Sequence, residues 1–215
     1  MVSNGESREV LDAMEQTARR AGALLRAAFD RPREIRYKGE VNLVTEADLA
    51  AEALIVEALR ERYPEIGVLA EEGGESGAAG ELRWLIDPLD GTNNFAHGLP
   101  VFCVSIALRD AGGPLLGVIY DPLRDELFSA ARGRGATLNG QPCRVSEAPD
   151  LLHGMLATGF PYERHSSIDN NSVAVALFLR RAQGIRRMGS AALDLAYVAC
   201  GRFDGYWEWG VSPWD

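Results

Sequence analysis

Two aspartates flank a proline and a leucine in an apolar stretch that runs from Trp84 to Phe95. Pro88 fixes its own φ and keeps Asp87 out of the helical region. Asp87 and Asp90 then bend toward one another, with the Leu89 carbonyl between them. Oxygen ligands of this kind select Mg²⁺, Mn²⁺ or Ca²⁺ over Zn²⁺. The spacing therefore predicts a site for a hard cation, although the same residues also make a good turn without any ligand.

The residues on either side of this turn extend the predicted site. Gly91 and Thr92 offer free backbone amides at the start of a helix, where a phosphate group binds readily. Glu71 and Glu72 follow a second apolar strand, and carboxylates crowded at the end of a strand are costly unless a cation lies among them. The two glutamates also fit a solvated acidic loop that continues to Glu75. Taken with the turn, they favour a site for a metal and a phosphate.

Three segments of the chain resemble the signatures of the inositol monophosphatase family, in order and at suitable separations. They are Glu71-Glu72, Asp87-Pro88-Leu89-Asp90-Gly91-Thr92-Asn93-Asn94-Phe95 and Pro213-Trp214-Asp215. Three further stretches agree with the same family: Gly98-Leu99-Pro100, Leu138-Asn139-Gly140 and Met188-Gly189-Ser190-Ala191-Ala192-Leu193-Asp194. The match runs from about Lys38 to the end of the chain. It is most similar to the bacterial inositol monophosphatases.

The resemblance implies a role for each candidate residue in a Mg²⁺-dependent phosphomonoesterase. The metal ligands would be Glu71, Asp87, the Leu89 carbonyl, Asp90 and Asp215, holding two or three Mg²⁺ ions, with Mn²⁺ as a substitute. One ion would activate the attacking water and another would stabilise the leaving alkoxide. The catalytic residues would be Glu71, Thr92 and Asp48, of which Thr92 and Asp48 orient the water. The substrate would be bound by the Gly91 and Thr92 amides at the phosphate and by Gly189, Ala191 and Glu208.

Asp48 also has a structural interpretation. Thr45-x-x-Asp48 is a capping-box pattern at the start of a helix, in which the carboxylate accepts a hydrogen bond from the backbone of the capping residue. Both interpretations can hold at once.

Glu208 alternates with two tryptophans in a predicted aromatic strand over residues 203–209. An unpaired carboxylate in such a strand would be expensive. A hydroxyl of a polyol substrate would satisfy it, and so would an ion pair with Arg187 or Arg202.

The elements that position these residues follow from the hydrophobic spacing. Apolar residues three and four apart predict a helix from Glu6 to Phe29 and a second helix from Thr45 to a stop at Tyr63-Pro64. Residues 35–44 between them predict a hairpin or a mobile loop with its tip at Lys38-Gly39-Glu40. Short apolar runs between Gly, Pro and Asp clusters predict strands over residues 66–70, 84–86, 101–108, 115–120 and 126–130.

The remaining sequence predicts a second structural part. It contains a predicted strand over residues 154–158, helices over 172–179 and 190–199, and the aromatic strand. We expect an α+β N-terminal part over residues 1–146, with a helix pair and an antiparallel sheet that carries the metal site, and an α/β C-terminal part over residues 147–215. By resemblance, the α/β fold is a layered αβαβα sandwich.

The composition of the chain excludes some classes of binding partner. The chain has 22 Lys and Arg against 31 Asp and Glu, a net charge of −9. This balance argues against nucleic acid as a ligand, because Lys and Arg bind its phosphates. The sequence contains no apolar run of roughly eighteen residues, the length a membrane helix needs. We therefore expect a cytoplasmic protein that does not bind membranes. By resemblance, we expect a homodimer that acts on a small-molecule phosphate ester.

Two functions remain open. The first is a lithium-sensitive phosphatase of myo-inositol monophosphate or a similar polyol phosphate; related enzymes act on histidinol phosphate, fructose 1,6-bisphosphate or 3'-phosphoadenosine 5'-phosphate with the same metal site. The second is a catalytically weak regulatory binding protein. Family members usually continue for several tens of residues after the Trp-Asp signature, so the end of this chain at Asp215 predicts a fold truncated at its C-terminus. That truncation and the arginines at 180, 181, 186 and 187 favour the second function, and the intact ligand set favours the first.

Overall fold

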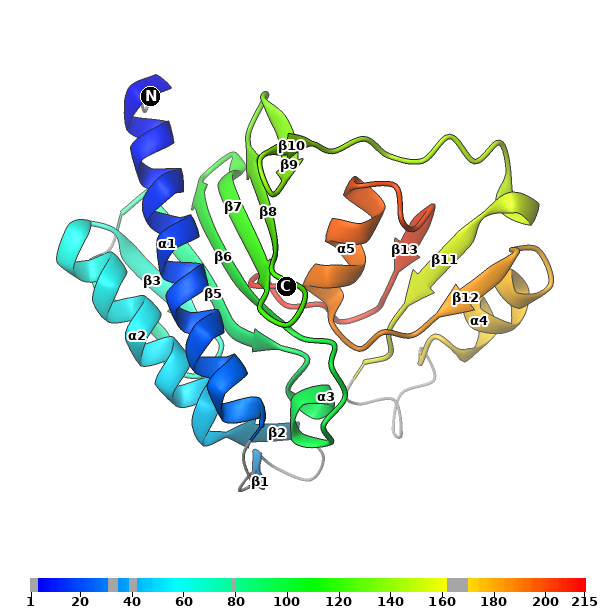
Figure 1. Cartoon of the computed structure of the whole chain (residues 1–215), viewed down its shortest axis with the longest axis horizontal. Coiled ribbons are helices and arrows are strands. Elements are labelled where there is room, and N and C mark those ends of the chain that lie inside the picture. Colours follow the sequence, from blue (N-terminus) through cyan, green and yellow to red (C-terminus); the bar gives the residue numbers. More distant parts are fainter. Residues whose placement is uncertain (1–3, 31–34, 39–41, 79, 162–169) are drawn as a thin grey trace.

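Two long helices lie side by side on one face of a large sheet (Figure 1). The computed structural model describes residues 4–30, 35–38, 42–78, 80–161 and 170–215. Helix α1 spans Asn4–Phe29 and helix α2 spans Glu46–Arg62, so both predicted helices are confirmed. A hairpin of β1 (Ile35–Lys38) and β2 (Asn42–Thr45) joins them. Of the predicted tip at Lys38-Gly39-Glu40, Lys38 is the last residue of β1, and residues 39 and 40 lie outside the described residues.

In the described part of the chain, eight strands form one sheet in the order β10-β9-β8-β7-β6-β5-β3-β4. The strands are β3 (Gly67–Ala70), β4 (Gly74–Ser76), β5 (Arg83–Asp90), β6 (Cys103–Asp110), β7 (Gly113–Asp121), β8 (Glu126–Ala131), β9 (Gly135–Leu138) and β10 (Gln141–Pro142). Neighbours are antiparallel except β3 and β5, which are parallel. The five strands predicted in this region are confirmed, and the sequence did not predict β4, β9 and β10.

Both faces of this sheet carry apolar side chains, because successive residues of a strand point to opposite sides. Along β6, Val104 and Ile106 join the core beneath the helix pair, together with Met14 of α1 and Ile55 of α2. Cys103 of the same strand belongs to a second core on the other face. The sheet therefore has a packing layer on each side.

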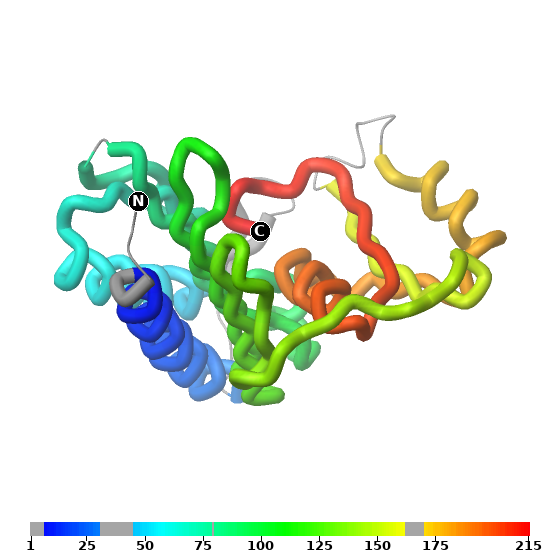
Figure 2. The backbone as a smooth tube through the Cα atoms, turned by 90° about the horizontal axis from the view of Figure 1, so that it is seen from above, coloured from blue at the N-terminus to red at the C-terminus, as the bar shows by residue number. Residues whose placement is uncertain are grey.

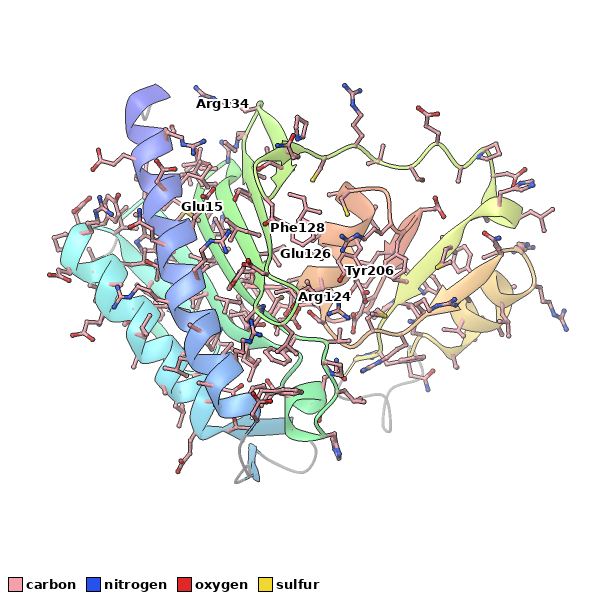
Figure 3. All side chains as sticks on the ribbon, in the orientation of Figure 1. Glu15, Arg124, Glu126, Phe128, Arg134 and Tyr206 are labelled. Carbon is pink, nitrogen blue, oxygen red and sulfur yellow. The ribbon has the colours of Figure 1, made fainter. Side chains whose placement is uncertain are left out.

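A second, parallel sheet follows, in the order β12-β11-β13. Its strands are β11 (Met155–Thr158), β12 (Gly184–Arg186) and β13 (Gly205–Trp207), preceded by the short helix η1 (Leu151–His153). Helix α5 (Ala191–Ala199) lies between the two sheets, with Phe128 of β8 on one side and Tyr206 of β13 on the other (Figure 3). Helix α4 (Ser172–Leu179) covers the far face through the Phe178 and Trp207 rings, 4.5 Å apart.

The order of layers is therefore helix pair, sheet, helix, sheet and helix, which confirms the predicted αβαβα sandwich. The chain end crosses back from the second sheet to the first (Figure 2), where the Trp214 carbonyl accepts a hydrogen bond from Ser105 Oγ at 3.1 Å. The large sheet ends at Pro142 and the small one begins at Met155; a division of the chain near residue 146 stays a prediction. None of the helices in the described ranges is long and apolar enough to span a membrane.

The predicted aromatic strand over residues 203–209 is wrong in its length. Strand β13 contains only residues 205–207, because its partner β11 stops at Thr158 and offers no further backbone groups to pair. Phe203 packs into the second core from the turn before the strand. Glu208 follows the strand, and Trp209 is 44% exposed.

Candidate active site

Strand β5 carries the two central aspartates, and it does not end before the turn as predicted. Asp87 pairs with Ser105 of β6, and after a shift in register Asp90 pairs with Cys103. Pro88 lies in this irregular stretch and has no backbone N–H to donate to the ladder. The bulged strand end aims both carboxylates to the same place.

Three carboxylates meet at this strand end. Asp87, Asp90 and Asp215 each place an oxygen within 4.8 Å of the other two. Asp87 and Asp90 are only 3% and 8% exposed. Asp215 comes from the end of the chain, where its carboxylate accepts a hydrogen bond from the Ser212 amide at 2.5 Å. Glu71 follows β3 as expected and lines the same pocket.

The charges of these carboxylates repel one another in a buried environment. Burial raises the pKa of Asp87 well above its usual value, and the charges of Glu71, Asp90 and Asp215 raise it further. Burial raises the pKa of Asp90 to about 7, against hydrogen bonds that favour its ionised form, and burial also raises the pKa of Asp215. A cation among the oxygens would offset this cost. An all-oxygen donor set suits a hard divalent ion, so these residues fit such a metal.

Asp48 approaches the pocket through Thr92. The Thr92 hydroxyl lies 2.9 Å from Asp48 Oδ1 and 3.0 Å from the Leu89 carbonyl, and its single hydrogen serves one acceptor at a time. Asp48 is fully buried and is not among the described residues that line the pocket. Its other oxygen accepts hydrogen bonds from the Thr45 amide and hydroxyl at 2.8 and 2.5 Å. The capping box is thus confirmed, and the same carboxylate also holds Thr92.

Gly91 permits the turn from β5 into α3 (Thr92–Ala96). Its φ of 103° lies in the left-handed region, and an added Cβ would lie 2.9 Å from the Val101 carbonyl oxygen. Both features require glycine. Gly91 and Thr92 line the pocket beside the aspartates, as the sequence predicted.

The second half of the molecule supplies the rest of the pocket lining. The predicted substrate residues Gly189, Ala191 and Glu208 all line it, together with Arg187 and Asp194. The structure therefore brings the predicted site residues to one pocket, apart from Asp48, which touches it through Thr92. Their individual roles stay predictions.

Glu208 is satisfied differently from either proposed arginine pairing. The Tyr206 hydroxyl donates a hydrogen bond to its carboxylate. Arg202 forms an ion pair with Glu126 instead, at 2.5 Å. Burial raises the pKa of Glu208, while the charge of Arg187 lowers it. The pairing with Arg202 is therefore wrong, and Arg187 acts on Glu208 through its charge.

Sequence reasoning missed residues that hold the ligands in place. Glu52 of α2 is 8% exposed and accepts hydrogen bonds from the Glu72 and Gly73 amides, both at 2.8 Å, which fixes the loop that begins at Glu71. The Ser190 hydroxyl and the Ala192 amide both donate to Asp90 Oδ2 at 2.7 Å. Glu52 could have been found from the sequence, because it is a glutamate among apolar residues in a predicted helix. The Ser190 contact joins distant segments, and nothing local indicates it.

Asp194 was also missed as a pocket residue. It is 1% exposed, and its Oδ1 has no hydrogen-bond partner among the described residues. Burial and the charges of Asp90 and Glu208 raise its pKa to about 8, which Arg187 opposes. The pocket lining that α5 contributes is therefore acidic as well.

We expect Ser190→Ala to weaken Mg²⁺ binding about tenfold, because a hydrogen bond to a charged group contributes about 1.5–3 kcal/mol. The hydroxyl orients Asp90 and favours its ionised form. Titration calorimetry measures the Kd for Mg²⁺ in each variant. Ser129→Ala is the matched control, since Ser129 donates to Glu15 Oε1 at the same 2.7 Å outside the pocket. Equal Kd values in the two variants would contradict the prediction.

Comparison with known proteins identifies relatives of the whole chain. Residues 6–215 match the sequence profile of the Inositol monophosphatase family. The chain is 49% identical over 197 residues to the inositol-1-monophosphatase of Synechocystis sp. PCC 6803, covering 91% of this chain and 69% of the relative. It is 46% identical over 209 residues to Nus factor SuhB of Escherichia coli K12, covering 96% and 78%. The structure of inositol monophosphatase from Anabaena (Nostoc) sp. PCC 7120 superposes with a TM-score of 0.88 at 48% identity, covering 97% of this chain and 77% of that one.

Proposed function

Because the chain belongs to the inositol monophosphatase family, we propose that it is a Mg²⁺-dependent phosphatase of myo-inositol monophosphate or a similar polyol phosphate. The observation that carries this proposal is the cluster of Asp87, Asp90 and Asp215, with carboxylate oxygens within 4.8 Å of one another in a pocket. Without a cation, these charges destabilise one another. With one, they become a binding site for a phosphate ester.

Different residues of the pocket would carry out different parts of the hydrolysis. Asp87, Asp90, Asp215, Glu71 and the Leu89 carbonyl would hold the divalent ions. When bound, such ions supply a nucleophilic water and stabilise charge on the phosphate and on the leaving oxygen.

Thr92 and Asp48 would orient the attacking water. The Thr92 hydroxyl donates either to Asp48 or to Leu89, so its oxygen remains able to accept a hydrogen bond from water. Asp48 is itself fixed by two hydrogen bonds from Thr45. The backbone amides of Gly91 and Thr92 would bind the phosphate oxygens.

The second half of the molecule would bind the alcohol. Gly189 and Ala191 offer backbone groups, and Glu208 offers a carboxylate already oriented by Tyr206. Carboxylates bind neighbouring hydroxyls well, which favours a polyol over a simple alcohol. The positive charge of Arg187 on the same wall attracts an anionic substrate to an otherwise acidic pocket.

Phosphate release from a panel of inositol, sugar, nucleotide and amino-alcohol phosphates tests the proposal. We expect turnover that requires Mg²⁺, stops in excess chelator and is fastest with an inositol or related polyol phosphate. A 46% identical relative is named a Nus factor, which favours a regulatory binding protein as the second candidate. Absence of Mg²⁺-dependent turnover on every ester would support that candidate and overturn the first.

Glu208→Gln is expected to lower kcat/KM for inositol monophosphate by about tenfold, since Glu208 offers a charged acceptor to a substrate hydroxyl. Hydrolysis of a small aryl phosphate, which lacks those hydroxyls, should change less than about twofold on the same reasoning. Parallel kinetics on the two esters give the ratio. Equal losses on both would mean that Glu208 is structural.

Family membership supports further proposals about the enzyme. They are inhibition by Li⁺, activity with Mn²⁺ in place of Mg²⁺, a homodimeric assembly and a cytoplasmic location.

A further inference from the structure

The side chain of Asn94 joins backbone groups from separate parts of the fold. Asn94 is only 6% exposed. Its Nδ2 lies 2.8 Å from the Val101 carbonyl and 2.8 Å from the Met188 carbonyl, with the Gly189 carbonyl farther away at 3.4 Å. A carboxamide nitrogen carries two hydrogens. Both are used, one toward the loop before β6 and one toward the segment before α5.

One side of this connection is the turn that carries the metal ligands. Asn94 belongs to α3, which begins directly after Gly91 and includes Thr92. The other side is the segment before α5, which carries Gly189 and Ala191 into the pocket. Asn94 itself is not among the described residues that line the pocket. It therefore acts on the pocket through the two segments it joins.

A second hydrogen bond joins the same two parts of the fold, but it ends on a carboxylate of the proposed metal site. Ser190 donates to Asp90, one of the three clustered carboxylates. Within the described ranges, the hydrogen bonds of the Asn94 side chain go to backbone carbonyls. Loss of the Ser190 contact should therefore change metal binding, whereas loss of the Asn94 contacts should move the Met188 and Gly189 carbonyls and leave Ser190 bonded to Asp90.

We propose that Asn94 is a positioning residue for the alcohol half of the substrate. It sets the distance between the metal turn and the backbone groups at Gly189 and Ala191, and so determines how strongly a polyol phosphate is preferred over a phosphate ester without hydroxyls. This inference rests on the proposed phosphatase function.

Two substitutions at Asn94 test the inference. Asn94→Ala removes both donors, and Asn94→Asp keeps the shape but turns an oxygen toward two carbonyl oxygens. In both, the KM for inositol monophosphate should rise about tenfold, because the hydrogen bonds that hold the Met188 and Gly189 carbonyls are lost or replaced by repulsion. The KM for a small aryl phosphate and the half-saturating Mg²⁺ concentration should each change less than about twofold, since none of the Asn94 side-chain hydrogen bonds among the described residues is made to a proposed metal ligand.

Asn139→Asp is the matched control. Asn139 also bridges two backbone groups, accepting from the Leu127 amide at 2.9 Å and donating to the Asp125 carbonyl at 3.0 Å, and it lies outside the pocket. It should leave the ratio of the two KM values unchanged. If KM rises equally for both substrates in the Asn94 variants, or if only their melting temperature falls, the positioning role is overturned.

Hydrogen exchange gives a readout that does not depend on turnover. Amides at residues 188–190 should exchange faster in Asn94→Ala than in the wild type, whereas those of α1 should not change. If the wild type shows no Mg²⁺-dependent hydrolysis, the proposed function and the substrate preference both fail, and exchange then decides only whether Asn94 positions residues 188–190. Unchanged exchange at residues 188–190 overturns that positioning role.

Discussion

Asp90→Asn is expected to lower kcat by about a hundred- to a thousandfold, the usual cost of removing one preorganised electrostatic group, while raising the melting temperature of the metal-free protein. Asparagine keeps the shape of Asp90 and can still accept hydrogen bonds from Ser190 and Ala192. It lacks the negative charge that holds a cation. It also lacks the charge that raises the pKa of Asp87 in the absence of one.

The opposite signs of these two effects distinguish a metal ligand from a structural aspartate. Asp121 is fully buried outside the pocket, forms an ion pair with Arg124 at 2.8 Å and accepts from the Leu123 and Arg124 amides at 3.0 Å. Asp121→Asn should therefore lower the melting temperature and leave kcat nearly unchanged. Kinetics at saturating Mg²⁺ and thermal melts in chelator, run on both variants, give the comparison. A metal-free Asp90→Asn that melts below the wild type would sink the assignment of Asp90 as a ligand.

The part of the site that local chemistry controls was predictable from the sequence. Asp87 and Asp90 lie in one bulged turn, and the proline between them and the following glycine dictate its shape. Asp215 reaches the same place from the end of the chain. No spacing argument connects it to the turn, and only the family resemblance placed it there. Contacts between distant segments, such as Ser190 with Asp90, follow from the tertiary fold and have no local pattern.

Helix α2 shows that functional acidic residues can hide the buried face of a helix from an analysis of hydrophobic spacing. Leu49 is an apolar residue of this helix, yet it is 49% exposed. The face that is buried carries Asp48 and Glu52 beside Ile55, Leu59 and two alanines. Both acids are buried because they hold Thr92 and the loop after β3. A buried face that contains functional acids looks polar in the sequence, so hydrophobic spacing identifies only part of it.

Long elements were predictable and short edge strands were not. The helices and the central strands bury repeated apolar residues, so their periodicity is strong. Strands β4 and β10 have three and two residues and are mostly exposed, which leaves no period to detect. Strand β13 was overextended because aromatic residues continue past its last paired residue. Its true end depends on the length of β11, which is a property of the sheet.

The second large effect is expected in the dependence of stability on pH. Metal-free protein should lose stability as the pH rises from about 4 to about 8, the range between ordinary carboxyl pKa values and the raised pKa values of Asp90, about 7, and Asp194, about 8. In this range the folded protein keeps protons that the unfolded chain has released. Stability falls with pH wherever the folded state binds more protons. The raised pKa values of Asp90 and Asp194 therefore stabilise the folded protein at pH values below the carboxyl pKa of the unfolded chain. This stabilisation is lost as the pH rises through the pKa values of the folded state.

Mg²⁺ should reverse this trend, because a cation binds the ionised carboxylates of the folded state and stabilises it by mass action. The gain in melting temperature on adding Mg²⁺ should then increase with pH across the same range. Melting curves at several pH values, with chelator and with Mg²⁺, measure both slopes. Asp90→Asn should flatten the metal-free slope, because one of the titrating groups is gone. A metal-free wild type that becomes more stable from pH 5 to pH 8 would show that these carboxylates are already ionised and compensated without a metal, and the proposed metal site would lose its physical basis.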